Sequence, residues 1–384
     1  MNILLVSAHL FTGLIGGESA KEIFGLAKAL SRRGHTVTIY ATDAFNRADK
    51  STLWTRHINE QGIDIVEFKN LHGRITIAPA LIPTMAKHSA QFDIIHLNQY
   101  PTFLNVISHH YANKYRIPYV LQAHGSLPGI TSNRILRQIY DTLWGHKILK
   151  DASRVIAVSQ MEVAQYKSNG IDTQSIRTIP NGVDTSEFEN LPERGTFRKK
   201  HGLTENQRVI LYLGRIHKVK GLALLARSFA SLAKDLPDTR LVIAGPDDGY
   251  LQALKKLVIS LKLESTIIFT GPVYGQDKLA VYVDADVYVL PSFYDVFGVT
   301  VLEACACGIP VIVSDCSGVA DIVGNQAGLI FSRNEAQLKQ SLLKMLTADK
   351  LRREYSKKGK LLVRNTYNWR EIAKQMEVVY DEIL

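Results

Sequence analysis

Short apolar runs alternate with longer amphipathic stretches along the whole chain. The runs have the length and β-branched content of buried strands, and the stretches between them have the length and polarity of helices. In the first half we predict strands at residues 3–8, 36–41, 63–68, 94–97, 119–123, 155–158 and 176–179. In the second half we predict strands at 209–213, 241–244, 267–269, 287–290, 311–313 and 328–331, followed from Ala336 by three helices.

This alternation predicts an α/β fold with two Rossmann-like, doubly wound domains that face a central cleft. Residues 181–203 are rich in turn-forming and charged residues and lack apolar periodicity, which indicates a linker. We therefore expect an N-terminal domain over residues 1–183 and a C-terminal domain over 184–365, with the last helix, 366–384, joining the N-terminal domain. A single large open sheet is the alternative.

Length and composition exclude several classes of protein. The chain has 384 residues, of which 46% are hydrophobic and 21% charged, so disordered, collagenous and fibrous proteins are excluded. Cys305, Cys307 and Cys316 lack the spacing of a disulfide framework or a zinc site, which indicates a reducing compartment. Residues 1–17 are interpreted as a strand and a loop and not as a signal peptide, because a basic beginning is lacking and glycines interrupt them. We expect a cytoplasmic protein whose membrane contact, if any, is peripheral and on the inner face.

The net charge of +10 is unevenly distributed. Residues 1–180 carry 19 Lys and Arg against 12 Asp and Glu, and the remaining residues carry 27 against 24. A basic half favours an acidic partner such as an anionic membrane or a phosphorylated substrate. Nucleic acid is disfavoured because the basic residues are not clustered with aromatic ones. Residues 132–150 form an amphipathic segment that could touch a membrane, but we favour a helix packed on the protein.

Two loops after predicted strands have the residues of phosphate-binding sites. At Gly16 and Gly17 a ligand can approach the backbone before a helix, although the spacing is not GxGxxG and a turn without a ligand is equally compatible. The stretch GRIHKVKG, residues 214–221, places Arg215 and Lys220 at a strand-to-helix junction. Two cations there can neutralise a diphosphate, whereas a solvated basic turn is the alternative.

Two acids and a histidine follow other predicted strands. Asp295 lies in the loop after strand 287–290 and Glu303 in the next helix, so both carboxylates can face one site and accept hydrogen bonds from sugar hydroxyls. Free N–H groups around residues 297–300 form a second anion site at the start of that helix. His124 follows strand 119–123 and can donate to a sugar hydroxyl or a leaving oxygen. Helix caps, solvated acids and a structural histidine are the alternatives.

Together these residues resemble glycosyltransferase family 4, a family of retaining, nucleotide-sugar-dependent enzymes with the GT-B architecture. The resemblance spans nearly the whole chain. It is carried by GG at 16–17, HG at 124–125, IPNGVD at 179–184, G-R-x(4)-K-G at 214–221, AGP at 244–246, FTG at 269–271 and the stretch 291–315.

The resemblance implies a role for each matching residue. Arg215 and Lys220 would hold the donor diphosphate, and Glu303 would bind the ribose hydroxyls. Asp295, where the family normally has Glu, would bind hydroxyls of the donor sugar, and His124 would contact the transferred sugar. The further donor-site residues are Gly16, Gly17, Gly214, Phe269, Gly271, Val273, Phe297, Gly298, Val299 and Thr300.

No metal is needed if the two cations neutralise the leaving diphosphate. Asp284 and Asp286 spell a D-x-D motif, but they precede a buried strand at a helix end, so we interpret them as capping or exposed residues. We predict no metal site and no cofactor beyond the nucleotide sugar itself.

We therefore expect a retaining glycosyltransferase that moves a sugar from a UDP or GDP sugar to a glycan or lipid-linked acceptor. Three alternatives remain: a nucleotide-sugar epimerase or phosphorylase on the same fold, a dinucleotide-dependent oxidoreductase, which the missing GxGxxG disfavours, and a non-catalytic protein that binds sugar nucleotides.

Overall fold

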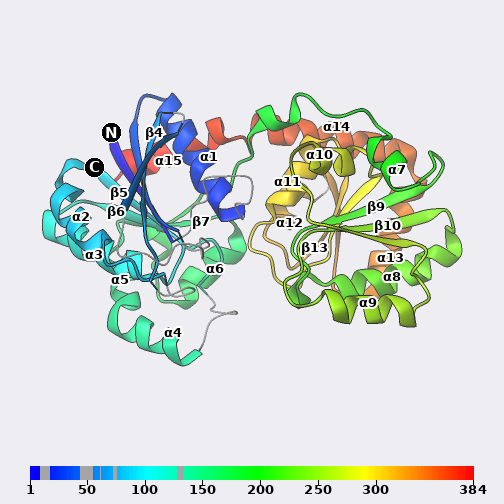
Figure 1. Cartoon of the computed structure of the whole chain (residues 1–384), viewed down its shortest axis with the longest axis horizontal. Coiled ribbons are helices and arrows are strands. Elements are labelled where there is room, and N and C mark those ends of the chain that lie inside the picture. Colours follow the sequence, from blue (N-terminus) through cyan, green and yellow to red (C-terminus); the bar gives the residue numbers. More distant parts are fainter. Residues whose placement is uncertain (9–17, 44–54, 61, 72–75, 128–133, 325) are drawn as a thin grey trace. The chain divides into compact units, whose positions relative to one another are not determined.

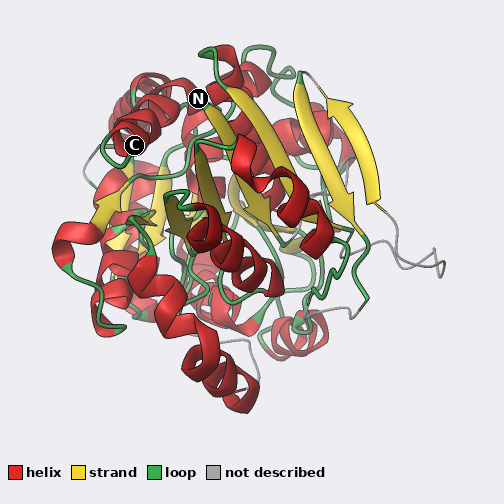
Figure 2. Ribbon diagram, turned by 90° about the vertical axis from the view of Figure 1, so that its left-hand side faces the viewer, coloured by secondary structure: helices red, strands yellow, loops and turns green. Residues whose placement is uncertain are grey.

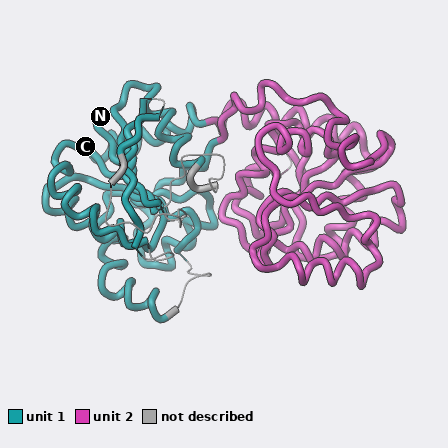
Figure 3. The backbone as a smooth tube through the Cα atoms, in the orientation of Figure 1, with its two compact units in different colours: residues 1–182, 369–384 teal, residues 183–368 magenta. Residues whose placement is uncertain are grey.

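The computed structural model describes the chain except residues 9–17, 44–54, 61, 72–75, 128–133 and 325. It divides into two compact units, drawn in separate colours in Figure 3. Unit 1 comprises Met1–Gly182 and Trp369–Leu384, and unit 2 comprises Val183–Asn368. The chain therefore leaves unit 1 once and returns to it near the C-terminus.

Unit 1 is built on a twisted sheet (Figure 2). Within the described residues the sheet has eight strands in the order β3-β4-β2-β1-β5-β6-β7-β8. Neighbouring strands are parallel except β3, which pairs antiparallel with β4 at one edge. The strands are β1 (Asn2–Ser7), β2 (Thr36–Thr42), β3 (Thr55–Glu60), β4 (Ile63–Phe68), β5 (Ile94–Asn98), β6 (Tyr119–Gln122), β7 (Arg154–Ala157) and β8 (Ile176–Thr178).

Helices cover both faces of this sheet, because alternate side chains of buried parallel strands point to opposite faces and both sets are apolar. One core lies under α1 (Glu18–Arg32) and α15 (Trp369–Asp381) and includes Leu5, Ile39 and Met376. The other includes Leu4, Leu97 and Tyr166. It lies under α2 (Leu81–His88), α3 (Phe103–Tyr115), α5 (His146–Asp151) and α6 (Gln160–Ser168).

The C-terminal helix is a full member of unit 1. Trp369, its first residue, packs so closely on α1 that a Cβ at Gly25 would lie 2.2 Å from the indole Nε1. Near its end the Tyr380 hydroxyl lies 2.7 Å from Nδ1 of the fully buried His96 on β5. Residues far apart in the sequence therefore share one core.

Unit 2 also has a parallel sheet, with six strands in its described part in the order β11-β10-β9-β12-β13-β14. In Figure 1 its strands run between α10, α11 and α14 on one side and α8, α9 and α13 on the other. The strands are β9 (Arg208–Leu213), β10 (Thr239–Ala244), β11 (Ile267–Gly271), β12 (Val287–Leu290), β13 (Val311–Ser314) and β14 (Gly328–Phe331). The helices are α7 (Thr196–Lys200), α8 (Leu222–Asp235), α9 (Leu251–Ser260), α10 (Gly275–Val283), α11 (Val299–Ala306), α12 (Ala320–Val323), α13 (Glu335–Thr347) and α14 (Asp349–Asn365).

Both sheets have Rossmann-like topology. If the strands of unit 2 are numbered 1 to 6 along the chain, they lie side by side in the order 3-2-1-4-5-6, as in the Rossmann fold. The strands of unit 1 extend outward from β1 and β5 in the same way, with β3 added at one edge. Two separate sheets exclude the single open sheet considered above. The order reverses between β9 and β12 in unit 2 and between β1 and β5 in unit 1, so these are the expected positions for ligands.

The chain passes between the two units at Gly182–Val183, within the predicted linker 181–203, but this range is more than a linker. Most of its residues belong to unit 2 and contain α7 and a 3-10 turn, and both Phe188 and Phe197 are buried. Asp284 anchors this segment, because its carboxylate accepts hydrogen bonds from the backbone N–H groups of Gly195 (2.5 Å) and Arg198 (2.9 Å). Asp284 therefore caps α7 across space and is not exposed.

The amphipathic segment 132–150 corrects a second expectation. It forms α4 (Arg134–Tyr140), a π-helical turn (Asp141–Gly145) and α5 (His146–Asp151). Its later part is packed on the protein as favoured above, since Ile148 and Leu149 are buried, but a set of its apolar side chains, here called the apolar ridge, is exposed. The ridge consists of Ile135, Leu136, Ile139, Leu143 and Trp144, which are 68%, 54%, 49%, 59% and 44% exposed.

Candidate active site

The switch point of the unit 2 sheet brings together the predicted cations and acids. Gly214, Arg215 and Lys220 follow β9, and Asp295 follows β12, the strand beside it. The other residues predicted in this unit lie at or next to the same carboxyl edge. They are Phe269 and Gly271 at the end of β11, Val273 just after it, Phe297 and Gly298 before α11, and Val299, Thr300 and Glu303 within α11.

Lys220 and Asp295 form an ion pair, with 2.6 Å between Nζ and Oδ2. Both side chains are mostly buried, at 14% and 13% exposure. The backbone of Asp295 is fixed on both sides, because its N–H donates to the Cys316 carbonyl and its own carbonyl accepts from Gly318. The sequence indicated separate roles for Lys220 and Asp295, and the structure couples them.

The glycine after Lys220 explains how the two loops meet. Gly221 has φ +69°, and a Cβ there would lie 1.9 Å from the carbonyl oxygen of Pro291. The N–H of Phe293 also donates to the Val219 carbonyl across the same junction. Only glycine combines this conformation with so close an approach, so the K-G pair places the Lys220 ammonium against the loop after β12.

Arg215 lies in a different environment. Its guanidinium contacts Asp248 at 2.6 Å, but the two side chains are 62% and 41% exposed. Exposed pairs of this kind contribute little to stability, because water screens both charges. Arg215 can therefore exchange its carboxylate partner for a phosphate at small cost.

Glu303 is buried on α11 and held by two residues of α10. Its Oε1 lies 2.5 Å from Nζ of Lys278, and its Oε2 accepts from the Tyr282 hydroxyl at 3.0 Å. Burial lowers the pKa of Lys278, but the charge of Glu303 and its hydrogen bond outweigh burial, so the pKa is raised and the lysine stays charged. Sequence reasoning missed both partners, although their i, i+4 spacing on one helix face is a usable signal.

The first turn of α11 offers backbone N–H groups to an anion. The helix begins after Gly298, which has φ +75° and supplies no side-chain cap. The Thr300 hydroxyl lies 2.7 Å from that of Tyr288, so it is occupied within the unit. Phe297 is buried, so its side chain belongs to the core.

Phe269, Gly271 and Val273 lie at the edge of the sheet and are partly exposed. The ammonium of Lys255 sits 5.8 Å from the centre of the Phe269 ring. The carbonyl of Gly271 accepts from the N–H of Gly245, which joins the ends of β10 and β11. A ligand at this edge meets backbone groups and one aromatic face.

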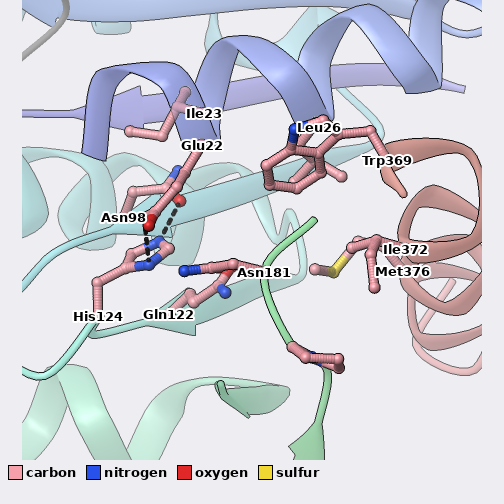
Figure 4. Close-up of a pocket in the computed structure, with 11 residues that line it drawn as sticks. Glu22, Ile23, Leu26, Asn98, Gln122, His124, Asn181, Trp369, Ile372 and Met376 are labelled. Carbon is pink, nitrogen blue, oxygen red and sulfur yellow. Dashed lines mark hydrogen bonds and ion pairs between the residues drawn. The ribbon is translucent and has the colours of Figure 1, made fainter. Parts of the chain in front are cut away.

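In unit 1 the predicted histidine lies in a buried polar cluster (Figure 4). His124 follows β6 with φ +50°, and its ring nitrogens face Glu22 and Asn98, each at 3.2 Å. Burial lowers the pKa of His124, but the hydrogen bond and charge of Glu22, with the charge of Glu162, outweigh it and raise the pKa. The cluster therefore favours a protonated imidazole.

Glu162 fixes the backbone around His124. This fully buried carboxylate accepts from the N–H of Gly125 at 2.6 Å and from that of Val158 at 2.8 Å. It thereby ties the turn after β6 to the turn after β7. Burial raises the pKa of Glu162 although both hydrogen bonds oppose the rise. Sequence reasoning missed this residue, because a glutamate in the first turn of a helix resembles any exposed cap.

The structure brings the unit 2 residues to one edge and places His124 in unit 1. Gly16 and Gly17 lie outside the described residues. Within the part of the chain that is described, no group of three or more His, Cys, Asp or Glu side chains is arranged to hold a metal ion. In the same part, no helix has both the length and the hydropathy needed to cross a bilayer.

Two family models match the chain in succession. The model described as Glycosyltransferase Family 4 matches residues 21–187, and that described as Glycosyl transferases group 1 matches residues 193–362. An uncharacterized glycosyltransferase of Methanocaldococcus jannaschii is 27% identical over 99% of this chain and 98% of its own length. A D-inositol 3-phosphate glycosyltransferase of Pseudarthrobacter chlorophenolicus is 34% identical, over 50% of this chain and 46% of that protein.

Solved structures share the fold over the whole chain. Sucrose-phosphate synthase from Thermosynechococcus elongatus superposes with a TM-score of 0.78 at 22% identity, over 99% of this chain and 98% of that one. HepE from Anabaena, in complex with UDP and glucose, has a TM-score of 0.79 at 20% identity and full coverage of both chains. Fold and family models together define a glycosyltransferase of GT-B architecture.

The chain belongs to the family 4 type of glycosyltransferases. It is therefore an enzyme that transfers glycosyl groups.

Proposed function

We propose that the protein transfers a sugar from a nucleoside-diphosphate sugar, of UDP or GDP type, to a hydroxyl of a glycan or a lipid-linked acceptor, with retention of configuration and without a metal. The observation that carries this proposal is the placement of Arg215 and Lys220 after β9 at the switch point of unit 2, where Lys220 pairs with Asp295, with Glu303 on the helix that follows β12. The HepE complex with UDP and glucose supports a nucleotide-sugar donor and a sugar-like acceptor.

Charge development explains the roles of these residues. As the bond between the sugar and the diphosphate breaks, negative charge grows on the leaving diphosphate and positive charge grows on the sugar ring. Arg215, Lys220 and the first turn of α11 stabilise the diphosphate more in the transition state than in the ground state. Because two cations supply the compensation, a metal ion is not needed.

The acids bind hydroxyls. Glu303 takes the ribose hydroxyls, and its carboxylate is already oriented by Lys278 and Tyr282. Asp295 takes hydroxyls of the donor sugar, and its side chain is one methylene shorter than the family's usual Glu. The Lys220–Asp295 ion pair connects the residue that binds the diphosphate to the residue that binds the sugar. A shift of either side chain therefore alters the position of the other. His124 contacts the transferred sugar through a ring that Glu22 and Asn98 orient.

Retention follows from attack on the face that the diphosphate leaves. The acceptor oxygen forms its bond to the anomeric carbon on that face, and the proton of the acceptor hydroxyl passes to an oxygen of the leaving phosphate. No covalent intermediate is required, and no residue is assigned as a nucleophile.

The apolar ridge favours a lipid-linked acceptor and peripheral contact with an anionic membrane at the cytoplasmic face. Leu143 and Trp144 are large, exposed apolar side chains, and Lys147 and Lys150 lie exposed on the following helix. Apolar side chains flanked by cations match the interface of an anionic bilayer, where the apolar groups enter the acyl boundary and the cations meet phosphates.

Thermal stabilisation by UDP, GDP, ADP, CMP and NADH, measured with EDTA present, tests the donor. A ligand at 100 times its Kd adds about 2.7 kcal/mol to the stability, so one nucleoside diphosphate should shift the melting temperature clearly. The matching sugar donor is then incubated with and without acceptors. Transfer only with an acceptor supports the proposal, whereas donor turnover without acceptor, turnover with free phosphate, or a shift with NADH alone would each favour one of the other enzyme classes. Binding with no turnover would indicate a non-catalytic protein.

A further inference from the structure

A groove of about 560 Å³ lies on unit 2, apart from the candidate active site. The lining includes no residue assigned to the candidate site, but it touches Ala306, the last residue of α11, three residues beyond Glu303. At 1.5 Å per residue Ala306 lies roughly 10 Å along the helix from its first residue and roughly 4.5 Å from Glu303. The groove is lined by Thr185, Phe188, Glu189, Ala306, Lys357, Lys360, Leu361, Val363 and Arg364.

Three cations on one face of α14 line this groove. Lys357, Lys360 and Arg364 are spaced by three and four residues, which places them along one side of the helix. All three are exposed, and none forms an ion pair with a carboxylate in the described part of the chain. By contrast, Lys358 on another side of α14 pairs with Glu354 at 2.6 Å. The three charges that face the groove are therefore outside any ion pair of the described residues.

A structural role accounts for two of these cations. The side chain of Lys360 crosses Gly308, where a Cβ would lie 2.2 Å from its Cε, and this puts its charge beside the C-terminal end of α11. A cation there interacts favourably with the helix dipole. Arg364 lies in the last turn of α14, where its charge interacts favourably with the dipole of its own helix. Lys357 lies in the middle of α14, away from either helix end, so the dipole does not account for its charge.

The rest of the groove suits a small molecule that carries one anionic group. Leu361, which is 47% exposed, supplies apolar surface above the buried Phe188 and Val363, and the Thr185 hydroxyl can donate or accept a hydrogen bond. With one carboxylate, Glu189, the lining has a net charge of +2, from three cations and one acid. The volume lies within the range of roughly 300–1,000 Å³ that is usual for small-molecule sites.

We propose that this groove binds a small phosphate ester as an effector of the enzyme. A phosphate monoester carries close to two negative charges near neutral pH, which matches the lining, and its carbon skeleton covers the apolar surface. The exposed acids Glu187 and Glu189 beside the groove disfavour the alternative of an anionic lipid surface.

The position of the groove explains why occupancy should affect transfer. Thr185 lies three residues after the chain leaves unit 1 at Gly182, and Arg364 lies five residues before it returns at Trp369. A ligand in the groove therefore contacts residues close to both points at which the chain passes between the two units. The expected effect on rate rests on the proposed function, whereas binding itself does not.

Isothermal titration with glycerol 3-phosphate and with inorganic phosphate, at constant ionic strength, tests the site. The variant Lys357→Ala/Arg364→Ala should bind glycerol 3-phosphate at least tenfold more weakly than the unmodified protein. The control Lys256→Ala/Lys350→Ala removes the same charge from exposed positions of unit 2 and should change the affinity less than twofold. Urea unfolding of both unliganded variants checks that each is folded.

The site would be overturned if both double variants lost affinity for glycerol 3-phosphate equally, or if saturating UDP displaced the ester. It would also be overturned if phosphatidylglycerol vesicles bound through Lys357 and Arg364 while neither glycerol 3-phosphate nor inorganic phosphate bound. In the transfer assay, glycerol 3-phosphate should change kcat/KM at least twofold in the unmodified protein and not in Lys357→Ala/Arg364→Ala. An unchanged rate together with Lys357-dependent binding would refute the effector role alone.

Discussion

Lys220 and Asp295 are joined by a contact of 2.6 Å between oppositely charged groups, although 75 positions separate them in the chain. The cation assigned to the diphosphate and the acid assigned to the donor sugar therefore act as a unit. Changing either residue alters the charge that the other presents to a ligand.

Replacing Lys220 and replacing Asp295 should affect nucleotide affinity and transfer differently. Lys220→Ala removes a charge-assisted contact worth about 1.5–3 kcal/mol, so nucleoside diphosphate affinity and kcat/KM should both fall roughly 10- to 100-fold. Asp295→Asn should lower transfer while leaving nucleoside diphosphate affinity unchanged or tighter, because it removes the carboxylate that competes for Lys220. Titration calorimetry and initial rates check both, with Arg227→Ala as an exposed control. Weaker diphosphate binding by Asp295→Asn would contradict this assignment.

The role of Glu303 is tested by replacing it alone and together with its partner Lys278. Glu303→Gln should weaken nucleotide binding, but it also leaves the buried Lys278 without its carboxylate, a loss that typically costs about 3–5 kcal/mol of stability. The double variant Lys278→Met/Glu303→Gln should regain most of that stability without regaining nucleotide affinity. Urea unfolding and nucleotide titration separate the two effects. If affinity returned together with stability, Glu303 would be structural and would not bind ribose.

Glu162 should be a positioning residue for His124. Glu162→Gln replaces one acceptor oxygen with an N–H₂ group that faces a backbone N–H, so the free energy of unfolding should fall by about 1.5–3 kcal/mol. Because the turn that carries His124 loosens, kcat should fall more than nucleotide affinity. Glu60→Gln on the edge strand β3 is the matched control. Unchanged kcat with reduced stability would limit Glu162 to a role in folding.

His96 predicts a loss of stability in acid. Burial, followed by the charge of His124, lowers the pKa of His96 to about 3 from the ordinary 6.5. Between these values the unfolded chain binds a proton that the folded chain does not, so stability falls as the pH falls, by about 1.4 kcal/mol per pH unit. The contribution of His124 to stability changes with pH in the opposite direction. Because its pKa is raised in the folded protein, this contribution is complete below pH 6.5 and is lost as the pH rises through the raised pKa.

The measurement is urea unfolding between pH 6.5 and 5, above the range in which most carboxylates titrate. His96→Gln should have a shallower slope than the unmodified protein, since glutamine does not titrate and can still bond to Tyr380. Identical slopes would assign the acid sensitivity to other groups.

The apolar ridge gives a prediction about membranes. Leu143→Ser/Trp144→Ser should reduce co-sedimentation with anionic vesicles at low salt at least fivefold and leave the melting temperature nearly unchanged, because both side chains are already exposed. Ile259→Ser/Val378→Ser, which removes exposed apolar groups elsewhere, serves as the control. Equal binding by all three proteins, or no binding by any, would rule out docking through the ridge.

All the strands that the apolar pattern predicted are present, and their ends differ from the predicted ends by at most two residues. The pattern failed at β3, Thr55–Glu60, whose sequence TRHINE contains one aliphatic residue. Among the described strands it lies at the sheet edge and pairs only with β4, so burial does not impose an apolar pattern on it. Its antiparallel direction depends on a backbone pairing that side-chain periodicity does not encode.

The site was predictable where its residues follow strands directly. Arg215, Lys220 and Asp295 could be placed at one sheet edge because the carboxyl ends of parallel strands share an edge. The partners Lys278, Glu22 and Glu162 come from helix faces, and their approach depends on packing angles that sequence spacing leaves open. The ridge was misjudged for the same reason, because an amphipathic pattern does not reveal whether its apolar side is covered.

The contribution of α15 to unit 1 has a consequence for synthesis on the ribosome. Unit 2 is one continuous segment and can complete its core as soon as residue 368 has emerged. Unit 1 lacks Ile372, Met376 and Tyr380 until residues 369–384 have been translated, so the part of its core that α15 completes stays open while unit 2 is made. The part of the protein that is made first is therefore the last to become complete.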